Sequence, residues 1–166
     1  MMPPALPLEA LIGSLLLQQK LTLATAESCT GGLVCHRLTN VPGCSAYVLG
    51  GIVSYAYDVK EHVLGVDHDT LYGQGAVSEA VARQMAQVAR RVLKADVAVS
   101  ITGIAGPGGG SADKPVGLVW IALAAPDAET AERHVWSGDR EANKAQSAEA
   151  ALALVFGYLR QRAARR

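Results

Sequence analysis

The stretch Thr25-Ala26-Glu27-Ser28-Cys29-Thr30-Gly31-Gly32 joins a short apolar, β-prone run at residues 21–24 to residues 33–38, which fit a helix. The polar and glycine-rich residues therefore lie at a strand-to-helix turn, where free backbone N–H groups point outward and the helix dipole favours negative charge. A hydroxyl at Ser28 in this place suits a nucleophile beside an oxyanion or phosphate site. The alternative is that Ser28 or Thr30 only caps the helix and that the glycines only relieve crowding.

The composition indicates one α/β domain. Of the 166 residues, 50% are hydrophobic and only 5% are aromatic, and the length is sufficient for a substantial core. Fifteen basic and fifteen acidic residues cancel, so the chain has no global basic field that would attract nucleic acid. The basic residues from Arg160 to Arg166 suit the end of a solvated helix better than a nucleic-acid-binding arm.

Hydrophobic periodicity and breaker residues predict alternating helices and strands. Helices are expected at residues 8–19, 33–40, 58–64, 78–95 and 140–162, with one further turn at 70–72. Strands are expected at residues 21–26, 46–55, 96–104, 116–125 and 130–136. Gly50-Gly51 in the second strand indicates a bulge or a close backbone approach. This order predicts a single-domain α/β fold, a three-layer α/β/α sandwich with a mixed sheet.

The cysteines and the N-terminus exclude several classes of protein. Cys29, Cys35 and Cys44 are odd in number and lack metal-type spacing with the histidines, so we expect neither a disulfide framework nor a metal site. Cys29 adjoins Ser28, and a buried, packed thiol is favoured there over a reactive one. The N-terminus does not resemble a signal peptide, and no apolar run approaches the roughly 18 residues of a membrane span. We therefore expect a cytoplasmic protein without a membrane partner.

A second candidate group lies at Tyr55-Ala56-Tyr57-Asp58-Val59-Lys60, at the end of the expected second strand. A lysine shortly after a strand can be partly desolvated, which lowers its pKa toward that of a useful base. Ser–Lys pairs are an alternative to Ser–His–Asp triads, and Tyr55 would then orient Lys60 or relay a proton. The alternative is a surface lysine beside a half-buried tyrosine.

Two further segments suit anion binding. The glycine-rich segment from Thr102 to Gly110 follows a buried strand, where α/β sheets place their binding crevices, and residues without Cβ let backbone amides approach an anion. It matches neither a P-loop nor the dinucleotide-binding pattern, and a flexible loop is the alternative. In Gly138-Asp139-Arg140 the arginine begins the last helix, where it can clamp a phosphate or form an ordinary surface ion pair.

Several motifs follow one another in an order that is more specific than any one of them. They are Thr25-Ala26-Glu27-Ser28-Cys29-Thr30-Gly31-Gly32, Val41-Pro42-Gly43-Cys44-Ser45, Gly51-Ile52-Val53-Ser54-Tyr55 with Lys60, Leu64-Gly65-Val66, Gly75-Ala76-Val77-Ser78-Glu79, Ser100-Ile101-Thr102-Gly103-Ile104-Ala105-Gly106-Pro107 with Gly108-Gly109-Gly110, Lys114-Pro115-Val116-Gly117 and Gly138-Asp139-Arg140. With these motifs, from about Leu8 to Leu159, the chain resembles the CinA C-terminal domain family.

The resemblance implies nicotinamide-nucleotide amidohydrolase activity, which hydrolyses the carboxamide of nicotinamide mononucleotide (NMN) to nicotinate mononucleotide and ammonia in pyridine nucleotide recycling. It implies Ser28 as nucleophile, Lys60 as base and Tyr55 beside them, with no cofactor and no metal. The resemblance ties Thr102 and Arg140 to the site. The backbone amides of the two glycine-rich turns add the other expected substrate-binding residues, which are Thr30, Gly31 and Gly32, with an oxyanion role, and Gly103, Gly106 and Gly108. The residue chemistry agrees, because an amide carbonyl needs a nucleophile, a proton acceptor and N–H donors for its oxyanion.

The chain departs from the family pattern at Tyr57, where members often carry Asn, and at Lys144, where they often carry a second Arg. Lysine keeps the charge but loses the bidentate fork. Many members have an additional N-terminal domain, for which 166 residues leave no room, so a single domain over residues 1–166 is expected.

Two other functions stay open. One is a non-catalytic nucleotide- or partner-binding module linked to competence or DNA repair, and the other is an amidase for another small amide. The zero net charge argues against direct DNA binding. A homo-oligomer is expected, because an apolar, glycine-rich chain of this size often buries a face by symmetry.

Overall fold

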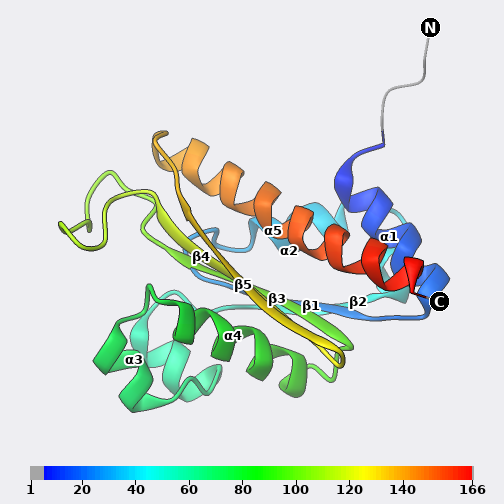
Figure 1. Ribbon diagram of the computed structural model, residues 1–166, viewed down its shortest axis with the longest axis horizontal. Coiled ribbons are helices and arrows are strands. Elements are labelled where there is room, and N and C mark those ends of the chain that lie inside the picture. Colours follow the sequence, from blue (N-terminus) through cyan, green and yellow to red (C-terminus); the bar gives the residue numbers. More distant parts are fainter. Residues whose placement is uncertain (1–5, 166) are drawn as a thin grey trace, which may run out of the picture.

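The structure, a computed structural model, describes residues 6–165 and consists of a mixed five-stranded sheet between two layers of helices (Figure 1). The strands are β1 (Leu23–Glu27), β2 (Val48–Val53), β3 (Val97–Gly103), β4 (Leu118–Ala125) and β5 (Ala128–Val135). The helices are α1 (Leu8–Gln19), α2 (Leu33–Thr39), α3 (His68–Gln74), α4 (Glu79–Val92) and α5 (Arg140–Ala164), with short turns of other helix types at η1 (Cys44–Ala46) and η2 (Val59–Val63). The predicted three-layer α/β fold with a mixed sheet is confirmed.

The strand order across the sheet is β2-β1-β3-β4-β5. Strand β1 runs parallel to both β2 and β3, whereas β4 is antiparallel to β3 and to β5. The carboxyl ends of β1, β2 and β3 therefore meet at one edge of the sheet, which is where open α/β sheets bind their ligands.

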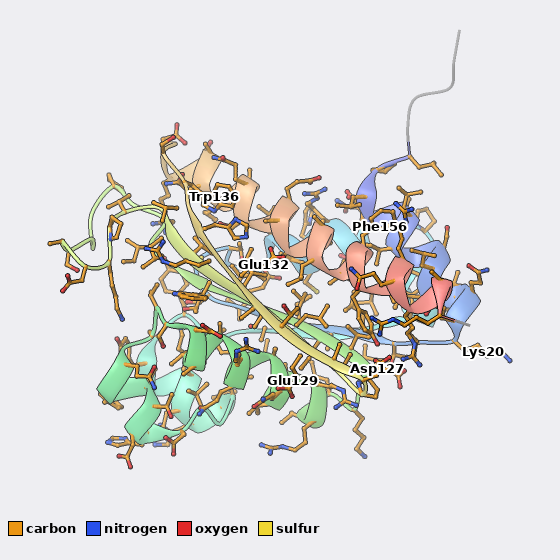
Figure 2. All side chains as sticks on the ribbon, viewed as in Figure 1. Lys20, Asp127, Glu129, Glu132, Trp136 and Phe156 are labelled. Carbon is orange, nitrogen blue, oxygen red and sulfur yellow. The ribbon has the colours of Figure 1, made fainter. Side chains whose placement is uncertain are left out.

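Helices α1, α2 and α5 pack together on one face of the sheet, and α3 and α4 lie on the other (Figure 1). The first face has the larger core, in which Ile12 and Leu16 of α1 and Leu152 and Val155 of α5 are fully buried. At the end of β5, Trp136 extends this layer, because its Nε1 donates to the hydroxyl of a serine of α5 at 2.9 Å (Figure 2).

The central strands are buried on both sides, as the apolar run at residues 97–101 predicts. Every residue of β1 is buried, and so is β3 up to Thr102. Ser100 is accommodated in this core because its hydroxyl donates to the carbonyl of Ala82 in α4 at 2.6 Å, so this buried hydroxyl is hydrogen-bonded.

The expected bulge in β2 is confirmed. The register between β1 and β2 shifts, so that Leu23 pairs with Val48 but Ala24 pairs with Gly50. A Cβ atom at Gly51 would lie 2.4 Å from the hydroxyl of Thr25. Glycine at residue 51 therefore lets β2 approach β1 closely.

Some element boundaries differ from the predicted ones. The helix after Ser78 ends at Val92 rather than near Ala95, and the last helix continues to Ala164. The short helix expected at residues 58–64 is a π-helix at η2, a rare form that is frequent at functional sites.

Candidate active site

Four segments that are distant in sequence meet at the carboxyl edge of the parallel strands. Ser28 follows β1, Ser54 and Tyr55 follow β2, and the glycine-rich loop follows β3. The N-terminus of α5, which carries Arg140, joins the same edge, since Arg140 contacts both Tyr55 and the glycine-rich loop. All of the segments selected from the sequence are thus brought together.

The pair at the centre of the site is Ser28 and Lys60. The Lys60 Nζ lies 2.8 Å from the Ser28 Oγ, and it also donates to the backbone carbonyl of Ser54 and, at 3.3 Å, to that of Tyr55. The Lys60 side chain comes from η2 and is only 1% exposed. This burial removes the ammonium form from water and lowers the pKa of Lys60 to about 8.

Glu27 has a role that the sequence did not reveal. Its buried carboxylate accepts hydrogen bonds from the Thr30 hydroxyl at 2.7 Å and from the N–H groups of Gly32, Val34 and Cys35 at 3.0, 3.1 and 2.8 Å. Glu27, and not Ser28 or Thr30, therefore caps the start of α2. The available signal was an acidic residue just before a helix, where it suits the dipole.

This carboxylate changes what the turn can bind. The Gly32 amide is already donated to Glu27, and the Gly31 amide donates to the Ser28 carbonyl at 3.0 Å. The N–H groups of Cys29 and Thr30 donate to no oxygen atom within residues 6–165. The Gly31 and Gly32 amides are therefore already bonded within the turn, whereas the next two amides after Ser28, those of Cys29 and Thr30, have only the Cys29 thiol as an acceptor within residues 6–165.

Cys29 is a packed neighbour of the nucleophile candidate rather than a second nucleophile. The side chain is buried in the core beneath the turn. Burial raises the pKa of its thiol to about 12, so the thiol stays protonated and unreactive near neutral pH.

Tyr55 approaches the Ser–Lys pair through its backbone only. Its carbonyl faces Lys60, whereas its exposed phenol Oη accepts a hydrogen bond from Arg140 Nη2 at 2.8 Å. The expected contact of the phenol with Lys60 is thus absent. Arg140 Nη1 donates to the carbonyl of Gly106 at 2.8 Å, so Arg140 links β2 to the glycine-rich loop.

Thr102 lies below the surface of the site. Its buried hydroxyl donates to the carbonyl of Ala76 at 2.8 Å, and the N–H of Ala76 donates to the Oη of Tyr57 at 3.0 Å. Thr102 and Tyr57 together hold the turn before α4 against the site.

The predicted glycines of the loop differ in what surrounds them. A Cβ atom at Gly103 would lie 2.6 Å from the Val119 side chain, so this glycine serves the packing of β3 on β4. Gly106 has a φ of +88° and accepts from Arg140 through its carbonyl. No atom lies within 4 Å of a Cβ at Gly108, which leaves that part of the loop open to a ligand.

Lys144, on the first turns of α5, is a second cation at the mouth of the site. Its Nζ would lie 3.9 Å from a Cβ at Gly31. Within residues 6–165 its ammonium group forms neither an ion pair nor a hydrogen bond, in contrast to the guanidinium of Arg140.

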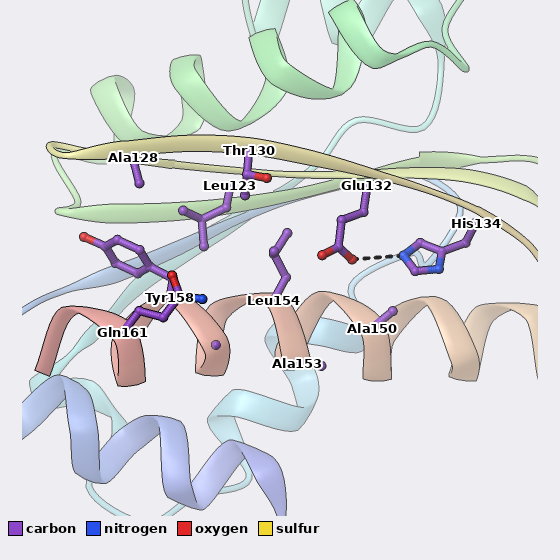
Figure 3. A pocket seen from close by; sticks show the side chains of 11 residues that line it. Leu123, Ala128, Thr130, Glu132, His134, Ala150, Ala153, Leu154, Tyr158 and Gln161 are labelled. Atoms are coloured by element: carbon purple, nitrogen blue, oxygen red, sulfur yellow. Dashed lines mark hydrogen bonds and ion pairs between the residues drawn. The ribbon is translucent and has the colours of Figure 1, made fainter. Parts of the chain in front are cut away.

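A hollow lies away from this site, between β5 and α5 (Figure 3). Its volume is about 460 Å³, and its polar lining includes Glu132 and His134, which form a pair at 3.2 Å. None of the site residues selected from the sequence lines it.

The described part of the chain provides no obvious metal or membrane feature. Residues 6–165 contain no cluster of three or more His, Cys, Asp or Glu side chains that could hold a metal ion. Among the same residues, no helix has both the length and the apolar character needed to cross a bilayer.

Comparisons with known proteins agree on one family. The family described as the CinA C-terminal domain matches residues 5–159. The chain is 52% identical over 145 residues to a CinA-like protein of Salinibacter ruber and 51% identical over 150 residues to one of Chlorobaculum tepidum. These matches cover 87% of the chain but only 35% and 36% of the relatives, so the chain spans about a third of the length of the curated relatives it matches.

Solved structures match over nearly their whole length. A CinA superfamily protein of Klebsiella pneumoniae superposes with a TM-score of 0.89 at 34% identity, over 93% of this chain and 96% of that one. The competence/damage inducible protein CihA of Agrobacterium tumefaciens gives a TM-score of 0.86 at 39% identity, over 95% and 98% of the two chains. The chain therefore belongs to the CinA C-terminal domain family.

Proposed function

We propose that the chain hydrolyses the carboxamide of NMN, with Ser28 as nucleophile and Lys60 as base. The observation that carries this proposal is the 2.8 Å contact between Lys60 Nζ and Ser28 Oγ, made by a buried lysine whose pKa is lowered to about 8. With this pKa, roughly one lysine in ten is neutral at pH 7, compared with fewer than about one in a thousand for an exposed lysine. The choice of NMN rests on the family resemblance.

The contacts of Lys60 orient its lone pair. A neutral amine has two N–H donors and one lone pair. The backbone carbonyls of Ser54 and Tyr55 accept the two N–H groups. The lone pair is then left for the O–H of Ser28, which is the arrangement that a general base requires.

The reaction proceeds in two balanced halves. Lys60 takes the proton of Ser28 while Oγ bonds to the amide carbon, and the N–H groups of Cys29 and Thr30 stabilise the oxyanion. The C–N bond then breaks, and ammonia leaves with the proton from Lys60. In the second half, water gives a proton to Lys60 and attacks the ester, after which the C–Oγ bond breaks and Ser28 regains its proton. The net change converts one amide and one water into a carboxylate and ammonium.

The cations at the mouth suit the 5′-phosphate of the substrate. Both terminal nitrogens of Arg140 already donate to Tyr55 and Gly106, whereas the ammonium of Lys144 is available beside Gly31. We therefore assign the phosphate to Lys144, with Arg140 fixing the wall of the site. The Glu27 carboxylate, which occupies the start of α2, excludes that helix end as the phosphate site.

Ammonia release from NMN tests the proposal. Ser28→Ala and Lys60→Met should each reduce the rate by at least ~100-fold, whereas Ser14→Ala, which removes an exposed hydroxyl of α1, should leave it unchanged. Full activity of Ser28→Ala would refute the nucleophile.

A substrate panel separates the alternative functions. Equal turnover of nicotinamide riboside, which lacks the phosphate, would indicate an amidase with a different specificity. Binding of NMN without any release of ammonia would indicate a non-catalytic module.

A further inference from the structure

Strand β5 has an open edge. It is the last strand of the sheet and pairs only with β4 within residues 6–165. The N–H of Trp136 donates to the carbonyl of Gly117 at 2.9 Å, so the even-numbered residues of β5 are those bonded to β4, because bonded pairs alternate in an antiparallel ladder. The N–H and C=O groups of residues 129, 131 and 133 therefore point away from the sheet. Such an edge is a template for another strand.

The side chains along this edge carry a self-complementary pattern. Glu129, Ala131 and Arg133 share the face of β5 that lies on α4, since Glu129 accepts from Gln87 of α4 at 2.9 Å. Figure 2 shows Glu129 on the side of α4 and Glu132 on the side of α5. Arg133 is exposed and forms no ion pair within the described residues. Glu129 and Arg133 thus lie two residues before and two residues after Ala131 on the same face of the strand.

We propose that two copies of the chain associate through antiparallel pairing of their β5 strands about a two-fold axis at Ala131. In this register, Glu129 of each protomer lies opposite Arg133 of its partner, and Thr130 lies opposite Glu132. Opposite charges in directly facing cross-strand positions stabilise the pairing. The two sheets then form one continuous sheet.

Neighbouring registers are less favourable. Moving the axis to residue 129 or to residue 133 places Glu129 opposite Glu129, or Arg133 opposite Arg133, and like charges in facing positions destabilise a ladder. A register shifted by one residue pairs an outward-facing residue with one that is already bonded to β4. An axis at Glu132 places Glu132 opposite Glu132, and an axis at Thr130 places Glu129 opposite Ala131 and loses both Glu129–Arg133 pairs, so the axis at Ala131 has the most facing opposite charges along the edge.

Helix α5 leaves room for this association. A hollow of about 460 Å³ lies between α5 and β5 and is lined by side chains of both, so α5 does not pack tightly against this strand (Figure 3). The site at Ser28 lies at the carboxyl end of the parallel strands, whereas β5 is at the far edge of the sheet. The dimer consequently does not depend on the proposed reaction.

Sedimentation velocity with charge-reversal variants tests the interface. The wild-type chain should dimerise, and Glu129→Arg or Arg133→Glu should each weaken the association constant at least ~10-fold, because the two-fold axis turns two attractive pairs into two repulsive ones. The double variant should regain the wild-type constant to within about threefold. Arg160→Glu, the same change on the exposed surface of α5, should have no effect. A monomeric wild type, or a double variant that stays as weak as the single ones, would overturn the proposal.

Oxidative cross-linking tests the register independently of charge. In a bonded antiparallel pair the facing Cα atoms lie about 5.5 Å apart, within the range of a disulfide, so Ala131→Cys should yield a covalent dimer. In the same register the two copies of residue 132 are too far apart, and Glu132→Cys should give none. Circular dichroism melting verifies that both variants are folded. Absence of the Ala131→Cys dimer, or equal cross-linking of the two folded variants, would refute the axis.

Discussion

Raising the pH from 6.5 to 9 should increase the kcat/KM of the proposed reaction along the titration of Lys60. The base acts as the neutral amine, so activity is present above the pKa of Lys60 and is lost as the pH falls below it. Burial, which lowers that pKa to about 8, places the transition inside the range in which the protein can be assayed.

The size of the expected increase in kcat/KM follows from the pKa of Lys60. The neutral fraction of a group with a pKa of about 8 is roughly 3% at pH 6.5, roughly 9% at pH 7 and roughly 90% at pH 9, so kcat/KM should rise about 30-fold. The thiol of Cys29, whose pKa is raised to about 12, does not titrate in this range. The phosphate of the substrate titrates near pH 6. The pH range of the assay therefore begins above that value, at pH 6.5.

The assay is the initial rate of ammonia release at subsaturating NMN, because kcat/KM reports on the free enzyme. Lys60→Arg provides the matched variant, since a guanidinium keeps the charge and stays protonated throughout. It should be inactive at pH 6.5 and should not recover at pH 9. A flat profile for the wild type, or a Lys60→Arg variant that gains activity with pH, would refute Lys60 as the base.

Three further predictions concern other contacts. Glu27→Ala removes the acceptor of four hydrogen bonds and should lower the free energy of unfolding by at least ~3 kcal/mol in urea denaturation; an unchanged midpoint would contradict this. Gly51→Ala places a Cβ 2.4 Å from the hydroxyl of Thr25 and should cost about 1–3 kcal/mol by the same measurement. Tyr55→Phe removes the acceptor for Arg140 and should raise KM about 10-fold with little change in kcat, whereas a proton relay through the phenol would require kcat to fall.

Much of the fold could be predicted because local signals agree with the tertiary structure. The apolar run of β3 is buried on both faces, and Ser78 caps α4 by accepting from the Val81 N–H at 3.3 Å. The ends of helices were less predictable. Helix α4 stops at Val92 because the chain turns there, with Lys94 at a φ of +53°, and no breaker residue such as Gly or Pro marks the place.

The composition of the site could be predicted more readily than its contacts. Ser28 and Lys60 were selected as nucleophile and base, and the structure places them 2.8 Å apart. The orientation of Tyr55 toward Arg140 depends on where α5 packs, 85 residues later in the chain, which no local pattern encodes. The capping role of Glu27 was missed for a different reason. Its donors are close in sequence, but a buried carboxylate is rare enough that a surface position is the default expectation.

The carboxylate of Glu27 also affects how the proposed reaction would end. The substrate presents a neutral amide next to Ser28, whereas the product presents an anionic carboxylate at the same position. Glu27, the residue before Ser28, is buried with its oxygens held by the start of α2, and charges in such a setting are poorly screened. A buried negative charge beside Ser28 disfavours the anionic product more than the neutral substrate, so Glu27 would oppose the attraction that the Lys60 ammonium exerts on the bound product and would favour its release.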